Sequence, residues 1–228
     1  MTAISVLDAI RARRSIRSFA ADPVDAVNVH ALLDAAVHAP TAMHAEPWLF
    51  AVIQDRAALK RYSDCAKSLL LNGTVHHDLH ALSPTSPSSG FLRAVSEPAF
   101  NIFYDAGTLI LICGRSTNAF VAADCWLAAQ NLMLAAPALG LGTCCIGSAL
   151  AAVNTPAIKD DLGIPSDVTV FAAIIVGVPA GPAPTASAGR KEPLILSWKA
   201  GPTSRRADRP SSPPEPAPPS SQEGRRGR

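Results

Sequence analysis

Four residues near the start of the chain could bind an anion. Arg13, Arg14 and Arg17 place three guanidinium groups within five residues, and Ser15 adds a hydroxyl between them. Guanidinium groups bind phosphate through charge-assisted hydrogen bonds, which are about twice as strong as neutral ones. The same cluster could instead be the solvated, basic end of a first helix, where cations favour the C-terminal dipole. The segments described next, which lie far away in the sequence, favour the anion pocket over a solvated helix end.

A further segment could supply a pocket for a planar ligand. It lies at 39–48 and reads Ala-Pro-Thr-Ala-Met-His-Ala-Glu-Pro-Trp, and a separate glycine-rich stretch follows at 139–147. Gly147 allows close approach of a ligand to the backbone because it has no Cβ, although it could also simply make a turn. Arg190 and Lys191 form a second basic group late in the chain. They are either a further phosphate contact or an exposed turn.

Taken in order, these segments resemble the nitroreductase family of flavoenzymes over roughly residues 4 to 198. The similarity is carried by Arg-Arg-Ser-x-Arg-x-Phe at 13–19, Ala-Pro-Thr-x-x-His-x-x-Pro-Trp at 39–48, Ala-Ala-Gln-Asn-Leu at 128–132, and the segments 139–147, 163–179 and 190–193. The resemblance implies an α+β fold with a mixed, mainly antiparallel central sheet flanked by helices. It also implies an intertwined homodimer with FMN at the subunit interface.

The resemblance assigns thirteen residues to the flavin. They are Arg13, Arg14, Ser15, Arg17, Pro40, Thr41, Ala42, His44, Cys145, Ile146, Gly147, Arg190 and Lys191. By this assignment the first three, with Arg190 and Lys191, meet the phosphate and ribityl groups. Arg17 lies near the pyrimidine edge, where a cation stabilises the negative charge of reduced flavin. Backbone amides of 145–147 approach the flavin N5.

Residues 40–44 would reach the flavin from the other subunit. Here the chain departs from the commoner family pattern, which has Asn at the position of His44 and Gln at that of Glu46. An imidazole can still donate or accept a hydrogen bond, so His44 either contacts the flavin or is a satisfied interface histidine. We expect Glu46 to pair or cap structurally.

The function that the resemblance implies is an FMN-dependent oxidoreductase. It would take hydride from NADH or NADPH and pass electrons to a nitroaromatic, quinone or related small acceptor by ping-pong exchange. No catalytic side chain is expected, because the flavin carries the electrons. The alternatives are a non-catalytic flavin-binding or storage protein, a member with other flavin chemistry (dehalogenation, enone reduction, flavin fragmentation, azoline oxidation), or an interaction protein that uses its Pro/Arg-rich tail.

Composition restricts the other possibilities. The formal charge of +2 divides into +3 for the last 28 residues, with six Arg and three acids, and −1 for the rest. A nearly neutral body argues against nucleic-acid binding. The five cysteines have no disulfide or zinc spacing, and no secretory signal or membrane span is evident, which indicates a cytoplasmic protein. His76, His77 and His80 have helical metal-ligand spacing, but no other ligand pattern completes a site and we expect no metal.

The hydrophobic pattern predicts interleaved helices and strands. One domain over 1–200 precedes a disordered Pro/Ser/Arg-rich tail at 201–228, which holds seven of the 20 prolines. Predicted helices cover 4–14, 25–38, 55–70, 118–139 and 156–163, and predicted strands cover 48–53, 108–113, 142–146 and 168–178. Asp25 and Asn118 are the expected helix caps. Residues 72–98 are expected to form a long loop that acts as a lid and selects the acceptor.

Overall fold

The computed structural model describes residues 4–73, 87–115, 118–181 and 191–199, and it divides into two compact units, Met1–Ser187 and Ala188–Arg228. Every helix and strand among the described residues belongs to the first unit. In the second unit the described residues, 191–199, are exposed and have no regular secondary structure. The predicted tail at 201–228 and the histidines at 76, 77 and 80 lie outside the described residues. The boundary at residue 200 stays a prediction.

The first unit is built on a four-stranded sheet with the strand order β1-β2-β4-β3. Its strands are β1 (Trp48–Ile53), β2 (Thr108–Arg115), β3 (Gly142–Cys145) and β4 (Val168–Gly177), and each neighbouring pair is antiparallel. β2 is buried at every residue except Arg115, as expected for an apolar central strand covered on both faces. The predicted α+β fold with a mainly antiparallel sheet is confirmed.

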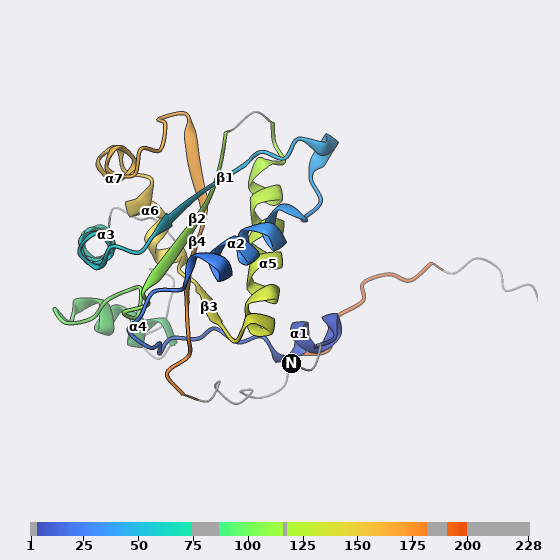
Figure 1. Cartoon of the computed structure of the whole chain (residues 1–228), viewed down its shortest axis with the longest axis horizontal. Coiled ribbons are helices and arrows are strands. Elements are labelled where there is room, and N and C mark those ends of the chain that lie inside the picture. The colour runs from blue at the N-terminus through green and yellow to red at the C-terminus, as the bar shows by residue number, and fades with distance from the viewer. Residues whose placement is uncertain (1–3, 74–86, 116–117, 182–190, 200–228) are drawn as a thin grey trace, which may run out of the picture. The chain divides into compact units, whose positions relative to one another are not determined.

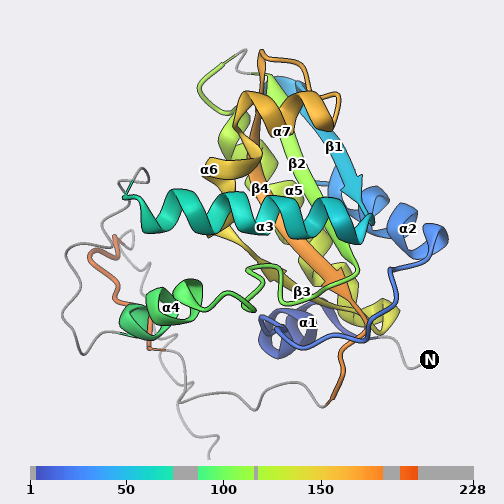
Figure 2. The ribbon, with the colours of Figure 1, turned by 90° about the vertical axis from the view of Figure 1, so that its left-hand side faces the viewer.

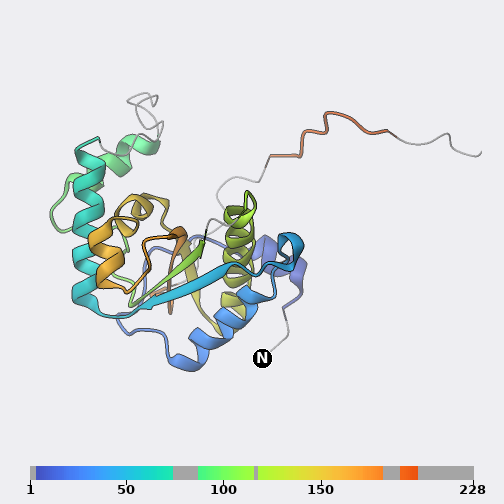
Figure 3. The ribbon, with the colours of Figure 1, turned by 90° about the horizontal axis from the view of Figure 1, so that it is seen from above.

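Helices cover both faces of this sheet (Figures 2 and 3). On one face lie α3 (Arg56–Leu71), α6 (Leu150–Val153) and α7 (Pro156–Asp161), and on the other lie α2 (Ala26–Val37) and α5 (Val121–Ala135). Alternate residues of β2 supply the two cores, Leu109 and Leu111 to the first and Ile110 and Ile112 to the second. Cys144 and Cys145 likewise belong to opposite faces, because neighbouring residues on a strand point in opposite directions.

The predicted helix ends were correct where a side-chain cap defines them. Asp25 accepts a hydrogen bond from Asn28 N (2.8 Å) and begins α2, whereas Asn118 is not the cap of α5. Asn118 Oδ1 accepts from Phe120 N (2.7 Å) in the preceding turn, and Phe120 stands at the N-cap position. The helix then tightens into the 3₁₀ turn η3 (Ala136–Leu139). Pro137 explains this change, because it lacks the N–H that an α-helix needs.

The prediction of one long loop over 72–98 was wrong at its second half. Residues Pro87–Ser96 form α4, on which Phe91 is half-buried and Val95 is buried. The buried Lys67 of α3 holds the exit of this helix, because its Nζ donates to the carbonyl oxygens of Glu97 (2.7 Å), Pro98 (3.2 Å) and Phe100 (2.9 Å). This helix was missed in the sequence analysis because its Ser-, Pro- and Gly-rich sequence has no clear helical periodicity of apolar residues. Short helix α6 was also missed.

Candidate functional site

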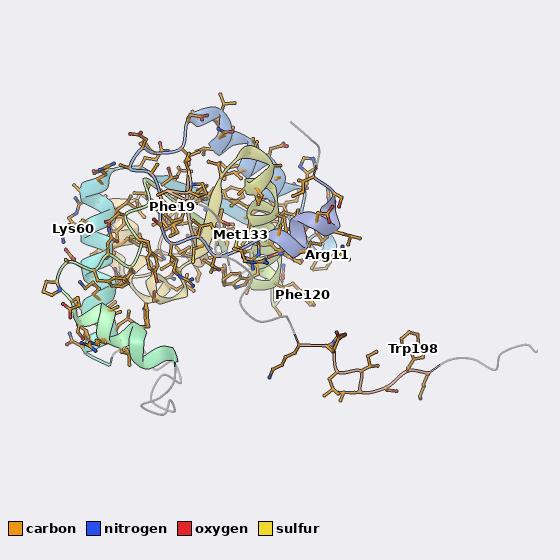
Figure 4. The ribbon with its side chains drawn as sticks, turned by 90° about the horizontal axis from the view of Figure 1, so that it is seen from below. Arg11, Phe19, Lys60, Phe120, Met133 and Trp198 are labelled. Carbon is orange, nitrogen blue, oxygen red and sulfur yellow. The ribbon has the colours of Figure 1, made fainter. Side chains whose placement is uncertain are left out.

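Packing against the sheet fixes the basic segment 13–19. Helix α1 (Val6–Ala12) ends at Arg13, and the chain then runs beside β3, where Ile16 N donates to Thr143 O (2.9 Å). Two glycines permit this approach, because a Cβ on Gly142 would lie 2.6 Å from Ile16 Cγ1, and one on Gly177 would lie 2.9 Å from Phe19 Cδ1. Phe19 is labelled in Figure 4. The apolar side chains Ile16 and Phe19 therefore anchor the segment that carries the cations.

The guanidinium groups of this segment have no acidic partner in the described part of the chain. Arg14 Nη1 donates to the carbonyl oxygens of Arg11 (2.6 Å) and Arg13 (2.9 Å) at the end of α1. The Arg17 guanidinium lies over the ring of Tyr104, with Cζ 5.8 Å from the ring centroid. The charges of this segment also affect Cys144. Burial raises the pKa of the Cys144 thiol, while the positive charges of Arg17 and Arg13 act to lower it. The segment is a cationic surface available to an anion.

The end of β3 brings Cys145, Ile146 and Gly147 to the same region. Ile146 is buried and its N–H donates to Ala173 O (2.8 Å), which fixes the backbone ahead of the 3₁₀ turn η4 (Gly147–Ala149). A Cβ built on Gly147 meets nothing within 4 Å among the described residues, and the φ of Gly147 is not positive. Neither packing against those residues nor backbone conformation therefore requires a glycine here. A ligand that approaches the backbone would require one.

Residues 40–46 form a separate, strained loop around the 3₁₀ turn η1 (Ala42–His44). Met43, His44 and Glu46 have positive φ of 54°, 54° and 41°, an unusual conformation for side chains with a Cβ. His44 Nε2 lies 3.5 Å from Glu46 Oε1, and both side chains are largely exposed. The expected structural pairing of Glu46 is therefore present. Backbone strain of this kind persists only where surrounding contacts hold it, and it is concentrated at functional sites.

Asp124 anchors this loop and was missed by the sequence analysis. Its Oδ1 accepts from Ala42 N (3.2 Å), the side chain is only 3% exposed, and Oδ2 has no hydrogen-bond partner among the described residues. A buried carboxylate with an unsatisfied oxygen is costly, so its retention calls for an explanation. The available signal was that Asp124 is the only charged residue in helix 121–135, whose other polar side chains are Gln130 and Asn131.

The two groups of predicted flavin contacts lie at opposite ends of α5 (Figure 1). Residues 40–46 pack at its N-terminal end through Asp124, whereas α1 and the basic segment lie beside its C-terminal end. The 15 residues of α5 span about 22 Å at 1.5 Å per residue. Within one chain the structure thus brings Arg13–Arg17 together with Cys145–Gly147 but leaves Pro40–His44 apart from them.

The remaining predicted contacts belong to the second unit. Lys191 is exposed there, and Arg190 lies outside the described residues. Among the residues that the structure does describe, no group of three or more His, Cys, Asp or Glu side chains could hold a metal ion. None of the helices in those ranges is both long enough and apolar enough to cross a membrane.

In the described part of this α+β unit, cations without an acidic partner lie beside an open glycine turn, an arrangement that could bind an anionic cofactor. The chain belongs to the Nitroreductase family, whose family model matches residues 10–178. A protein of Methanothermobacter thermautotrophicus with the provisional name NADH dehydrogenase/NAD(P)H nitroreductase is 29% identical over 181 residues, covering 78% of each chain. A nitrobenzene nitroreductase of Ectopseudomonas oleovorans is 28% identical over 196 residues, covering 75% of this chain and 85% of the relative.

A solved structure shares the same fold. The nitroreductase of Bacteroides fragilis with bound FMN superposes with a TM-score of 0.70 at 24% identity, over 86% of this chain and all of the other.

Proposed function

We propose that this protein is a homodimeric FMN-dependent oxidoreductase that takes hydride from NADH or NADPH and reduces a nitroaromatic, quinone or related small acceptor by ping-pong exchange. The observation that carries the proposal is the cationic segment 13–17, anchored by Ile16 against Gly142 beside the open backbone at Gly147. Bound FMN would accept the hydride and pass the electrons on. The relatives named above as nitroreductases support the same donor and acceptor classes.

The chain's own residues would bind and orient the cofactor. Arg13, Arg14 and Ser15 would hold the phosphate and ribityl groups, and Arg17 would keep a positive charge beside the ring. The backbone N–H of Gly147 would face the ring edge where a Cβ would otherwise intrude. Contacts from Cys145, Ile146, Arg190 and Lys191, and from residues 40–44 of a second copy, complete the proposed set.

The separation of the two halves of the proposed site supports the proposal of a homodimer. One chain keeps residues 40–44 about the length of α5 away from Arg13–Arg17, so in the proposed site a second copy would supply the missing half. Apolar side chains are available for the interface: Val6 and Leu7 on α1 are 72% and 61% exposed, and Trp126 and Leu127 on α5 are 40% and 44% exposed. Burial of such side chains is the usual driving force for association.

The free state of all five cysteines is in line with a reducing, cytoplasmic location, which we include in the proposal. Burial raises the pKa of Cys113 to about 11 and that of Cys125 to about 12. Their thiols therefore stay protonated at neutral pH and take no part in the proposed redox chemistry.

The visible absorption spectrum of the purified protein tests the proposal. It is recorded with FMN under anaerobic conditions, then after NADH, and in a parallel sample after NADPH. We expect bound flavin whose absorbance bleaches with at least one nicotinamide and returns when a nitroaromatic or quinone is added. Bound flavin that never bleaches would favour a storage protein, and a protein that binds no FMN would refute the proposal.

A further inference from the structure

A strained turn ahead of β2 presents an aromatic ring to the cationic segment. Tyr104 and Asp105 have φ of 52° and 53°, so two consecutive residues with a Cβ adopt the left-handed region. Side-chain bonds hold the turn: Asn101 Nδ2 donates to Asp105 Oδ1 (3.0 Å), and Asn101 Oδ1 accepts from Phe103 N (2.9 Å). Strain that the surroundings hold in place points to a functional constraint on the side chains it directs.

The ring that this turn directs is that of Tyr104, which lies under Arg17. The guanidinium carbon is 5.8 Å from the ring centroid, within the range of a cation–π contact. Phe100 supports the ring from the side, edge-on at 5.6 Å, and Phe91 of α4 packs edge-on against Phe100 at 6.5 Å. Tyr104 is half-buried, with the aromatic row packed at its side and the Arg17 guanidinium over its face.

A second cation–π pair in the chain clarifies what is unusual about Arg17. Arg61 lies over Tyr62 at 5.9 Å, but the same guanidinium also pairs with Asp161 (3.1 Å), so its charge is compensated. No carboxylate in the described ranges lies within ion-pair distance of Arg17. A neutral ring orients this guanidinium without cancelling its charge. That arrangement suits a site whose ligand brings the negative charge.

We propose that Tyr104 is a positioning residue that aims the Arg17 guanidinium at the bound flavin through its ring face. The inference rests on the proposed function and adds a residue that contacts Arg17. The tyrosine hydroxyl is not needed for this role, whereas the electron-rich face of the ring is. The aromatic row Phe91, Phe100 and Tyr104 then connects α4 to the charge beside the cofactor.

The test measures the Kd for FMN of the purified apo-protein by fluorescence quenching. Tyr104→Leu should raise Kd by about three- to thirtyfold, the range of a cation–π contact, and Tyr104→Phe should leave it within about twofold. Tyr62→Leu is the matched control, which removes the other stacked tyrosine and should leave Kd unchanged. In the double variant Arg17→Met/Tyr104→Leu, the loss should not exceed that of Arg17→Met by more than about twofold.

A series of fluorinated phenylalanines at position 104 keeps the test independent of folding, because fluorine weakens the electron-rich face while preserving the ring shape. Kd should rise step by step with fluorination. Unchanged Kd across that series, or fully additive losses in the double variant, would overturn the role of Tyr104 while leaving the proposed function intact. Absence of FMN binding by the wild type would overturn both.

Discussion

The two ends of helix α5 hold the two halves of the candidate site by different means. At the C-terminal end, the basic segment is laid on β3 and β4 through Ile16 and Phe19, whose approach depends on Gly142 and Gly177. At the N-terminal end, the loop 41–46 is exposed, strained and tied to the helix by Asp124. One half is part of the core of its own chain, and the other has a conformation that one chain alone does not explain.

If the protein forms the proposed homodimer, this difference predicts which half of the site depends on assembly. The basic segment has buried apolar anchors, so its geometry should be set when the chain folds. The loop has three residues with a Cβ at positive φ, and few contacts hold this strained backbone. The buried Oδ2 of Asp124, beside the loop, lacks a hydrogen-bond partner among the described residues. In the proposed homodimer, we expect a second copy and its cofactor to supply contacts that this loop lacks within its own chain.

The largest effect on stability and FMN binding should come from Gly142→Val, which displaces the basic segment from β3. Its side chain would collide with Ile16, because even a Cβ would lie 2.6 Å from Ile16 Cγ1. We expect a loss of about 3 kcal/mol in the free energy of unfolding, typical of severe overpacking. FMN Kd should rise about tenfold or more, since displaced arginines lose charge-assisted hydrogen bonds worth about 1.5–3 kcal/mol each.

Gly147→Ala is the matched control for stability alone, because a Cβ at that position meets nothing within 4 Å among the described residues. Its FMN Kd should rise, because the proposed site places the ring edge against this backbone. Its free energy of unfolding should stay within about 0.5 kcal/mol of wild type, the usual range for surface changes. Urea denaturation measures the free energy of unfolding of both variants, and FMN titration measures their Kd. Normal stability and normal FMN affinity in Gly142→Val would show that Ile16 does not anchor the cations.

The next largest effect should come from Asp124→Ala, which releases the loop end. Loss of the acceptor for Ala42 N should cost about 1–2 kcal/mol in the free energy of unfolding. Asp124→Asn keeps an acceptor oxygen and removes the buried charge, so it should be close to wild type in stability. Urea denaturation of the two variants separates hydrogen bonding from charge. If Asp124→Ala and Asp124→Asn lose the same free energy of unfolding, the loss comes from the removed charge and not from the hydrogen bond to Ala42 N.

A smaller effect on the free energy of unfolding should appear at alkaline pH, where buried thiols near the two ends of α5 respond to different charges. Burial, the neighbouring Cys113 and Asp124 raise the pKa of Cys125 from its ordinary 9.0 to about 12. The folded state thus keeps a proton that the unfolded state releases, so this contribution to stability is complete below pH 9 and is lost as pH rises toward 12. Cys113 and Tyr62, with pKa values of about 11 and 12, contribute with the same sign.

Variants at the two ends should change this alkaline loss in opposite directions. Asp124→Asn removes a charge that raises the pKa of Cys125, so the loss should shrink. Arg17→Met removes a charge that lowers the pKa of Cys144, so the loss should grow. Each change should be below about 1 kcal/mol, because one pKa unit corresponds to about 1.4 kcal/mol. Urea denaturation of apo-protein at pH 8 and pH 10.5 measures it, and a shift of the same sign in both variants would contradict this electrostatic difference.

The smallest effect should come from Arg115→Ala, away from both ends. Arg115 Nε pairs with Asp167 Oδ2 at 2.9 Å, with both side chains more than half exposed. Exposed pairs contribute about 0–1 kcal/mol, so stability and FMN affinity should hardly change. A loss of FMN affinity here, measured by the same titration, would mean that general surface charge explains the effects assigned to the basic segment.

The sequence could predict elements whose determinants are local. β1 has the predicted bounds, and the Asp25 cap begins α2, because a short apolar run and a side-chain cap each depend on neighbouring residues. Helix α4 was not predictable in this way, since Pro87–Ser96 has few apolar residues and depends on partners such as Lys67. The contact of Ile16 with Gly142 and that of Asp124 with Ala42 join residues 126 and 82 positions apart, respectively, and no local pattern specifies them.

The most direct test of the account is complementation between two inactive variants. One carries Arg13→Ala/Arg17→Ala and the other Thr41→Ala/His44→Ala, and each alone should bind FMN poorly. Co-refolded at equal amounts, half of the two-fold symmetric dimers are hybrids with one intact site, so about a quarter of all sites should regain wild-type Kd. Recovery of that fraction would establish that each site takes its two halves from different chains. No recovery, in a mixture shown by light scattering to be dimeric, would contradict it.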